Sequence, residues 1–167
     1  MNKKISIGLT LLVCFSFLFF PTGQAVAGAT RTEFTGHETP DPEDPGFPGE
    51  IFLADGNIHI RGMVTVYNMT TSDPRVGGRD EVTINVNFDG STFSGRMWGT
   101  FRLSNPDGYW FGTWTGVREL NGFAYIRGTA DGHGDYEGMR IFLDIQRLSP
   151  DPAFPEDISG YVLEPGG

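Results

Sequence analysis

Glycines recur at alternate positions inside segments that otherwise have the composition of β-strands. Gly95 and Gly99 form one such pair, and Gly112 and Gly116 form another. Glycine weakens the interior of a strand, so its repetition there indicates a sharply curved sheet or a close approach of two backbones. A sheet must curve in order to close on itself. The glycines therefore predict a small closed barrel.

Alternating apolar and polar residues, interrupted by turn residues, divide the rest of the chain into strands. Turns are predicted at Asp89-Gly90, at 105–108 and at Asn121-Gly122. Strands are predicted near 57–69, 81–88, 92–103, 109–117, 122–131, 137–148 and 158–163, with weaker candidates at 30–35 and 51–54. The fold class is all-β, and the expected architecture is a single antiparallel up-and-down barrel of about eight strands. A β-sandwich is the alternative.

The two ends of the chain differ in character from its middle. Residues 1–27 contain two lysines, an apolar run over 5–20 and a small-x-small sequence at 25–27, which is typical of a secretory signal peptide. We expect cleavage after Ala27 and a secreted or periplasmic protein that is not embedded in the membrane after cleavage. Residues 28–50 are predicted to be an N-terminal arm and an acidic, proline-rich linker. Residues 51–167 are predicted to form the barrel domain, including a C-terminal strand.

The charge of the mature chain argues against several classes of partner. Lys3, Lys4 and the single cysteine, Cys14, all lie before residue 28, so ten arginines remain against 21 acidic residues, a formal net charge of −11. This charge disfavours nucleic acid and anionic membrane surfaces as partners. The absence of any other cysteine excludes a disulfide-stapled scaffold and a cysteine nucleophile.

The strand periodicity also predicts which residues face inward. Large apolar residues share a strand face with glycines, a mixture suited to the inside of a small barrel. The residues expected to line an apolar lumen and bind a ligand are Phe93, Met97, Phe101, Trp110 and Trp114. Arginines and aromatic residues, among them Trp98, Tyr109 and Tyr125, are expected on the outer face. Such a face suggests a partner subunit in a homo-oligomer (a trimer or a dimer), a ligand surface, or a covering segment such as the N-terminal arm. In 58–67 we expect Ile58, Ile60, Val64 and Val66 to share one face and His59, Arg61, Met63, Thr65 and Tyr67 the other.

The sequence contains no recognisable complete set of catalytic residues. Asp131, His133, Asp135 and Glu137 are close together, but their spacing does not match a calcium loop, and the glycines among them are typical of a tight hairpin. His59 and Arg61 share a strand face and form only a weak candidate for acid–base catalysis. We predict no catalytic residue, no metal site and no cofactor.

The run 132–139, Gly-His-Gly-Asp-Tyr-Glu-Gly-Met, resembles the glycine-rich strand–turn–strand of allene oxide cyclase-like and dirigent-like barrels. The chain is also similar to small secreted bacterial proteins through the Trp98–Phe101 and Gly112–Gly116 segments and its C-terminal end. The resemblance implies an eight-stranded barrel, often trimeric, that binds a hydrophobic small molecule. The cyclases' pocket cysteine has no counterpart in the mature chain, so no catalytic residue is transferred.

Three functions follow from these observations. The first is a secreted barrel that binds a hydrophobic small molecule in its lumen. The second is a cyclase or isomerase acting on a hydrophobic substrate, which requires polar side chains that project into the lumen. The third is a structural or surface protein without a ligand, whose aromatic outer face packs against copies of itself or against another envelope component.

Overall fold

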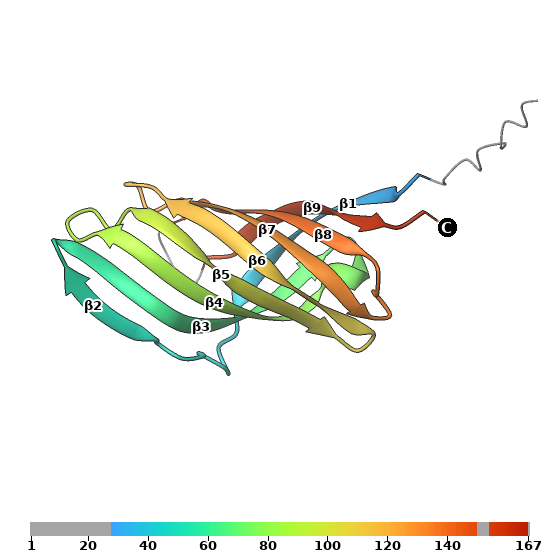
Figure 1. Ribbon diagram of the computed structural model, residues 1–167, viewed down its shortest axis with the longest axis horizontal. Helices are drawn as coiled ribbons and strands as arrows, with labels where there is room; N and C mark the ends of the chain where they lie inside the picture. The colour runs from blue at the N-terminus through green and yellow to red at the C-terminus, as the bar shows by residue number, and fades with distance from the viewer. Residues whose placement is uncertain (1–27, 150–153, 167) are drawn as a thin grey trace, which may run out of the picture.

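The computed structural model describes residues 28–149 and 154–166, which form nine antiparallel strands in a single sheet (Figure 1). The predicted signal peptide lies outside the described residues. In chain order the elements are β1 (Thr30–Pro40), β2 (Glu50–Ala54), β3 (Asn57–Thr71), a 3₁₀ turn η1 (Pro74–Val76), β4 (Gly78–Asp89), β5 (Gly95–Asn105), β6 (Gly108–Arg118), β7 (Ala124–Gly134), β8 (Arg140–Arg147) and β9 (Glu156–Glu164). No helix in these ranges is long and apolar enough to span a membrane.

Eight of the strands form a ring. Strands β3 to β9 pair with their neighbours in chain order, and β1 pairs with both β9 and the last five residues of β3. Strand β2 pairs only with the first five residues of β3 and stays outside the ring (Figure 1). The prediction of an all-β, antiparallel, barrel-like fold with about eight strands in its ring is therefore confirmed.

The boundary predicted between a linker and the barrel at residue 50 is wrong. Strand β1 continues to Pro40, and residues 36–40 pair with β3, so the end of the predicted arm belongs to the ring. The following segment, 41–49, runs across the outside of β3. The Phe47 amide donates to the Val64 carbonyl at 2.9 Å, and the Asp41 amide donates to the Val66 carbonyl at 2.8 Å. This segment covers Val66, which is fully buried although it faces away from the lumen.

A bulge in β3 reverses part of the predicted facing. The pairing of β3 with β4 shifts between Ile60 and Met63, and Gly62 there has a φ of 64°, a conformation that glycine adopts easily. The extra residue places Ile60 on the lumen side together with Met63 and Tyr67. The prediction that Ile60 shares a face with Val64 is wrong, because simple alternation does not survive a bulge.

Glycines on the inner face allow adjacent backbones to approach closely. A Cβ atom on Gly112 would overlap the Thr129 carbonyl oxygen and lie 2.6 Å from the Ala130 Cβ on the paired strand β7. A Cβ on Gly99 would overlap the Thr83 carbonyl oxygen and lie 3.0 Å from the Trp114 indole nitrogen. These contacts support the interpretation that in-strand glycines permit the tight coiling of the sheet.

One end of the ring is filled by side chains. Here η1 lies between β3 and β4, and Val76, Leu103 and Trp110 are fully buried. The Trp110 indole stacks on Tyr136 with a centroid separation of 4.9 Å and donates to the Arg75 carbonyl at 2.7 Å. We call this part of the barrel the closed end. The end that holds the β4–β5 and β6–β7 turns is called the open end.

Substituting Gly112 tests the role of the glycines. We expect Gly112→Val to lower the free energy of unfolding by about 1–3 kcal/mol, because the side chain must displace the backbone of β7. Thr113→Val is the matched control, since Thr113 is exposed on the outer face of the same strand. Urea unfolding measures both. A Gly112→Val midpoint equal to or above that of the wild type, with an unchanged slope, would overturn the inside–outside assignment.

Candidate functional site

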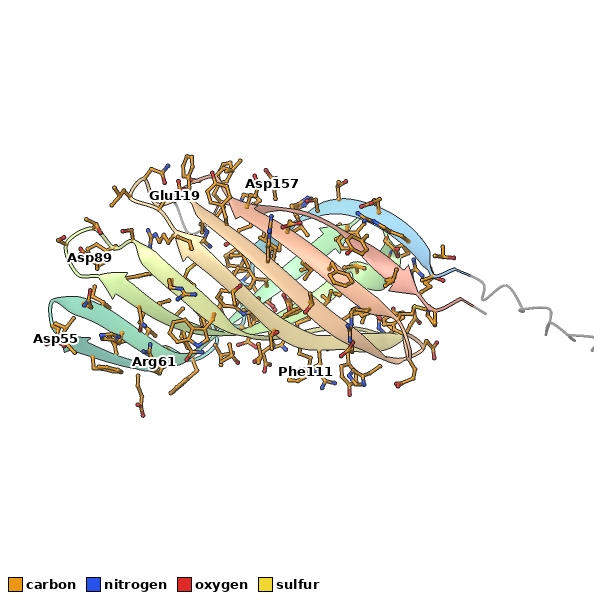
Figure 2. The ribbon with its side chains drawn as sticks, turned by 45° about the horizontal axis from the view of Figure 1, so that its top comes forward. Asp55, Arg61, Asp89, Phe111, Glu119 and Asp157 are labelled. Carbon is orange, nitrogen blue, oxygen red and sulfur yellow. The ribbon has the colours of Figure 1, made fainter. Side chains whose placement is uncertain are left out.

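The lumen toward the open end contains a cavity of about 570 Å³. Residues from all eight strands of the ring line it. Most of the wall is apolar, and its apolar side chains are those of Ile60, Met63, Val82, Ile84, Val86, Phe88, Met97, Phe101, Trp114, Ala124, Ile126, Leu143 and Ile145. The labelled residues Asp55, Asp89 and Glu119 mark the loops at the open end (Figure 2). The barrel is thus packed at one end and hollow toward the other.

Three of the five predicted ligand-binding residues line this cavity. Met97, Phe101 and Trp114 form part of its wall. Trp110 faces inward as expected, but it is buried in the closed end and does not reach the cavity. The prediction that Phe93 faces the lumen is wrong. Phe93 lies in the β4–β5 turn with a φ of 55° and is 53% exposed. Strand β5 begins only at Gly95, after a turn in which the Asp89 amide donates to the Ser94 carbonyl at 2.9 Å.

A polar cluster interrupts the apolar wall. It consists of Glu38 on β1, Tyr67 on β3, Asp80 on β4, Arg147 on β8 and Glu156 on β9, and we call it the lumen polar cluster. Arg147 and Glu156 form an ion pair. Glu38 and Asp80 are only 3% and 2% exposed and take part in no ion pair within the described residues.

The cluster also contains polar atoms without hydrogen-bond partners. Across the described residues, four buried side-chain nitrogen or oxygen atoms have no partner: Glu38 Oε2, Asp80 Oδ1, Trp114 Nε1 and Arg147 Nε. All four belong to residues that line the same cavity. Buried polar atoms are nearly always hydrogen-bonded, and leaving one unpaired costs about 1–3 kcal/mol. Their concentration in a single cavity indicates a place where a polar group of a ligand fits.

Burial changes the ionisation of the carboxyl groups. Desolvation raises the pKa of Asp80 to about 7, with a smaller contribution from the charge of Glu81. Desolvation also raises the pKa of Glu38 well above its usual value, and the charges of Asp80 and Glu156 add to the effect. The pKa of Glu156 is raised by burial too, although Arg147 opposes that change. The pKa of Tyr67 is raised by desolvation and by the neighbouring carboxylates, so its phenol stays protonated.

The sequence pattern carried a partial signal for these residues. Asp80 precedes Val82 by two positions, Glu156 precedes Ile158 by two and Arg147 follows Ile145 by two, so each continues an inward-facing series. Extending the alternation past the apolar residues would have found them. Glu38 could not be predicted in this way, because its segment has the composition of a linker. Charged residues are mostly exposed in proteins, so such residues at strand ends are not expected to line a lumen.

The polar residues that the sequence suggested for catalysis do not line the cavity. His59 and Arg61 lie on the outer face, where both contact the Asn87 side-chain oxygen at 2.7 Å. Tyr109 stacks on His133 with a centroid separation of 4.6 Å and lies under the Arg102 guanidinium at 3.7 Å. These contacts confirm the predicted outward face of interleaved arginines and aromatic residues.

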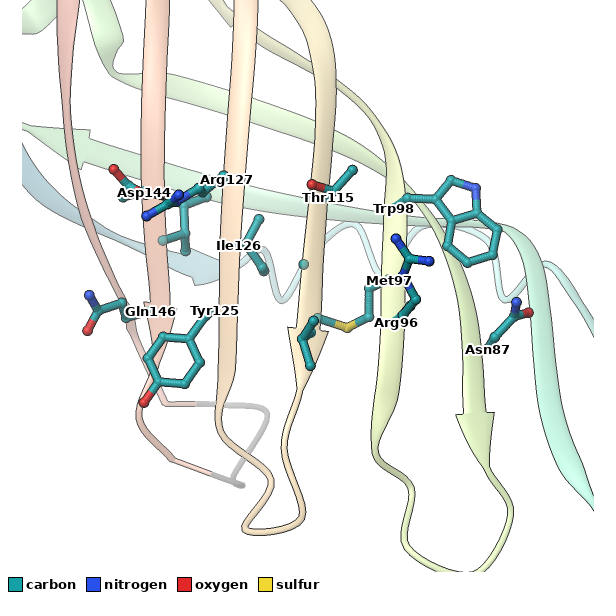
Figure 3. A pocket seen from close by; sticks show the side chains of 13 residues that line it. Asn87, Arg96, Met97, Trp98, Thr115, Tyr125, Ile126, Arg127, Asp144 and Gln146 are labelled. Carbon is teal, nitrogen blue, oxygen red and sulfur yellow. Dashed lines mark hydrogen bonds and ion pairs between the residues drawn. The ribbon is translucent and has the colours of Figure 1, made fainter.

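The outer face carries a second hollow, across β4 to β8, of about 820 Å³ (Figure 3). Trp98 and Arg96 flank it on β5, and Tyr125, Arg127 and Asp144 flank it on β7 and β8. Arg127 and Asp144 pair with each other at 2.9 Å, with side chains 86% and 56% exposed. Because these charges are solvated and paired, this hollow lacks the desolvated, unpartnered groups of the lumen. The lumen is therefore the stronger candidate site.

Acidic side chains of the β7–β8 hairpin contact basic side chains. Asp131 pairs with Arg140 across the hairpin at 2.7 Å, and His133 lies 4.0 Å from Glu137. Within 28–149 and 154–166, no group of three or more His, Cys, Asp or Glu side chains is placed to hold a metal ion.

Comparisons with protein-family models, with curated proteins and with solved structures found no match to this chain.

Neutralising Asp80 should change how stability depends on pH. Below about pH 4, Asp80 is protonated in both the folded and the unfolded states. Between about pH 4 and 7, only the unfolded state releases the proton. The folded state therefore becomes less stable relative to the unfolded state as the pH rises. Asp80→Asn removes this loss. We expect the variant to become more stable than the wild type by on the order of a few kcal/mol as the pH rises from 4 to 8.

Urea unfolding at several pH values provides the measurement. Asp157→Asn is the control, because it makes the same substitution at a residue exposed on the outer face of β9. A stability difference between Asp80→Asn and the wild type that does not vary with pH would show that Asp80 ionises normally in the folded state.

Proposed function

We propose that this protein is an exported barrel that binds a hydrophobic small molecule in its lumen. The observation that supports the proposal is the apolar cavity of about 570 Å³. Ligand sites in proteins are typically concave, mostly apolar and about 300–1,000 Å³ in volume, with a few polar groups that orient the ligand. The cavity and the lumen polar cluster have this composition.

The distribution of large and small side chains explains why the lumen has space. An eight-stranded barrel is just wide enough either to be filled by its own side chains or to hold one small ligand. At the closed end, Trp110, Tyr136 and Leu103 fill the interior. Toward the open end, Gly122, Ala124 and Gly128 contribute little volume to the wall. The hollow region therefore follows from where the sequence places its small residues.

Filling the cavity with a side chain should abolish binding. Ile84 lines the lumen and pairs with Met63 and Gly99, both on the inner face. We expect Ile84→Trp to weaken binding of a neutral, polarity-sensitive apolar fluorophore such as N-phenyl-1-naphthylamine by at least about tenfold, because the indole occupies the ligand's space. Fluorescence titration of the protein expressed from residue 28 measures the affinity.

Thr113→Trp is the matched control, since it adds the same side chain at an exposed position on the outer face. It should bind the fluorophore as the wild type does. Equal affinities for all three proteins would place the fluorophore outside the lumen and count against the proposal. No binding to the wild type, together with no small molecule retained by protein purified from its natural source, would favour a structural protein without a ligand.

A cyclase or isomerase is the second candidate, and the Asp80 carboxyl favours it. A general acid or base works best when its pKa is near the operating pH, and burial brings the pKa of Asp80 to about 7 inside the cavity. Isomerisation leaves the mass of a ligand unchanged, so chromatography of the bound compound before and after incubation is the test. Conversion by the wild type but not by Asp80→Asn would favour the enzyme over the binding protein.

A further inference from the structure

We propose that the ligand of the lumen carries a positively charged amino group, and that Glu38 and Asp80 bind this group while the apolar wall binds the rest of the molecule. The inference rests on the proposed function and adds the chemical class of the ligand. Its basis is the arrangement of charges around the cavity, together with the two carboxylate oxygens that have no hydrogen-bond partner.

The charged and titratable groups of the cavity wall do not balance. They are Glu38 on β1, Tyr67 on β3, Asp80 on β4, Arg118 on β6, Arg147 on β8 and Glu156 on β9. Arg147 pairs with Glu156, and the Arg118 guanidinium lies over the Phe88 ring, 5.9 Å from its centroid. Glu38 and Asp80 therefore form no ion pair with any described residue, although both are almost completely buried and the charge of Arg147 lowers the pKa of Glu38.

An ammonium group suits the two unpartnered carboxyl oxygens better than other polar groups do. It offers three hydrogen-bond donors, so it can bind Glu38 Oε2 and Asp80 Oδ1 at the same time. In a desolvated cavity, its attraction to a carboxylate is much stronger than in water. A ligand carboxylate would instead place a negative charge beside three carboxyl groups, of which only one has an arginine partner.

Binding of such a ligand should release a proton. Burial raises the pKa of both Glu38 and Asp80, so near neutral pH the empty site retains protons that the unfolded chain would have lost. An incoming ammonium ion favours the charged carboxylates and displaces a proton to the solvent. The affinity for an amine should therefore rise with pH, whereas the affinity for a neutral ligand of the same shape should not rise.

Three compounds of equal chain length test the inference: n-octylamine, n-octanol and n-octanoate. The amine stays protonated and the octanoate stays ionised between pH 6 and 8, so any change in affinity reports on the protein. Calorimetric titrations at pH 6 and pH 8, in buffers of different ionisation enthalpy, measure both affinity and proton release. We expect n-octylamine to bind most tightly, and about tenfold more tightly at pH 8 than at pH 6.

The variant Glu38→Gln/Asp80→Asn keeps the shape of the site and removes its charge. We expect it to lose both the preference for n-octylamine over n-octanol and the proton release. Asp157→Asn, which removes an exposed carboxylate from the outer face of β9, should behave as the wild type. This control separates the effect of the lumen from that of the overall negative charge.

The possible results separate the two proposals. Equal affinities for n-octanol and n-octylamine, or tightest binding of n-octanoate, would overturn the ammonium inference and leave binding in the lumen intact. An amine preference that Asp157→Asn weakens as much as the double variant does would also overturn it. Failure of all three compounds to bind the wild type would count against the proposed function itself.

Discussion

The closure of the ring by β1 is the constraint on which the rest of the structure depends. This strand pairs with β9 along nine residues and with the end of β3 along five. Without it, β3 and β9 would each present a row of unpaired backbone groups, and an open edge of this kind invites pairing with other chains. Closure also carries Glu38 into the lumen, so the strand that completes the fold supplies part of the candidate site as well.

The division of the lumen into a filled and a hollow part follows from the order of large and small residues along the strands. Strand β6 carries Trp110 into the closed end and Trp114 into the cavity wall, with Gly112 between them. The glycine allows β7 to approach, as the Ala130 contact shows, while the two indoles remain on the same face. The Trp110 indole N–H has a hydrogen-bond partner, whereas the Trp114 indole N–H has none among the described residues. This difference agrees with the burial of Trp110 in the core and the position of Trp114 in the cavity wall.

Strand positions, the barrel and most of the inward face could be predicted from the sequence, because alternation and turn residues are local signals. The facing of β3 could not, because the bulge at Gly62 depends on pairing with β4. Phe93 was predicted to line the lumen because it continues the alternating sequence pattern of the following strand. In the structure it lies in the turn closed by the Asp89–Ser94 hydrogen bond, before the strand begins. The lumen polar cluster was missed because its five members come from five strands, and no local pattern brings them together.

The lumen polar cluster departs from the rule that buried polar groups are hydrogen-bonded, because Glu38 Oε2 and Asp80 Oδ1 have no partner in the described part of the chain. Replacing buried ionic groups with apolar residues is often neutral or stabilising, so stability alone does not explain Glu38 and Asp80. Local departures from such rules are typical of functional sites, where stability is given up for recognition or chemistry. The desolvation that makes these two carboxylates costly in the empty barrel also strengthens their attraction to a complementary charge. Under the proposed function, a cavity built in this way would discriminate between ligands by the charge of one group, and its apolar wall alone would not.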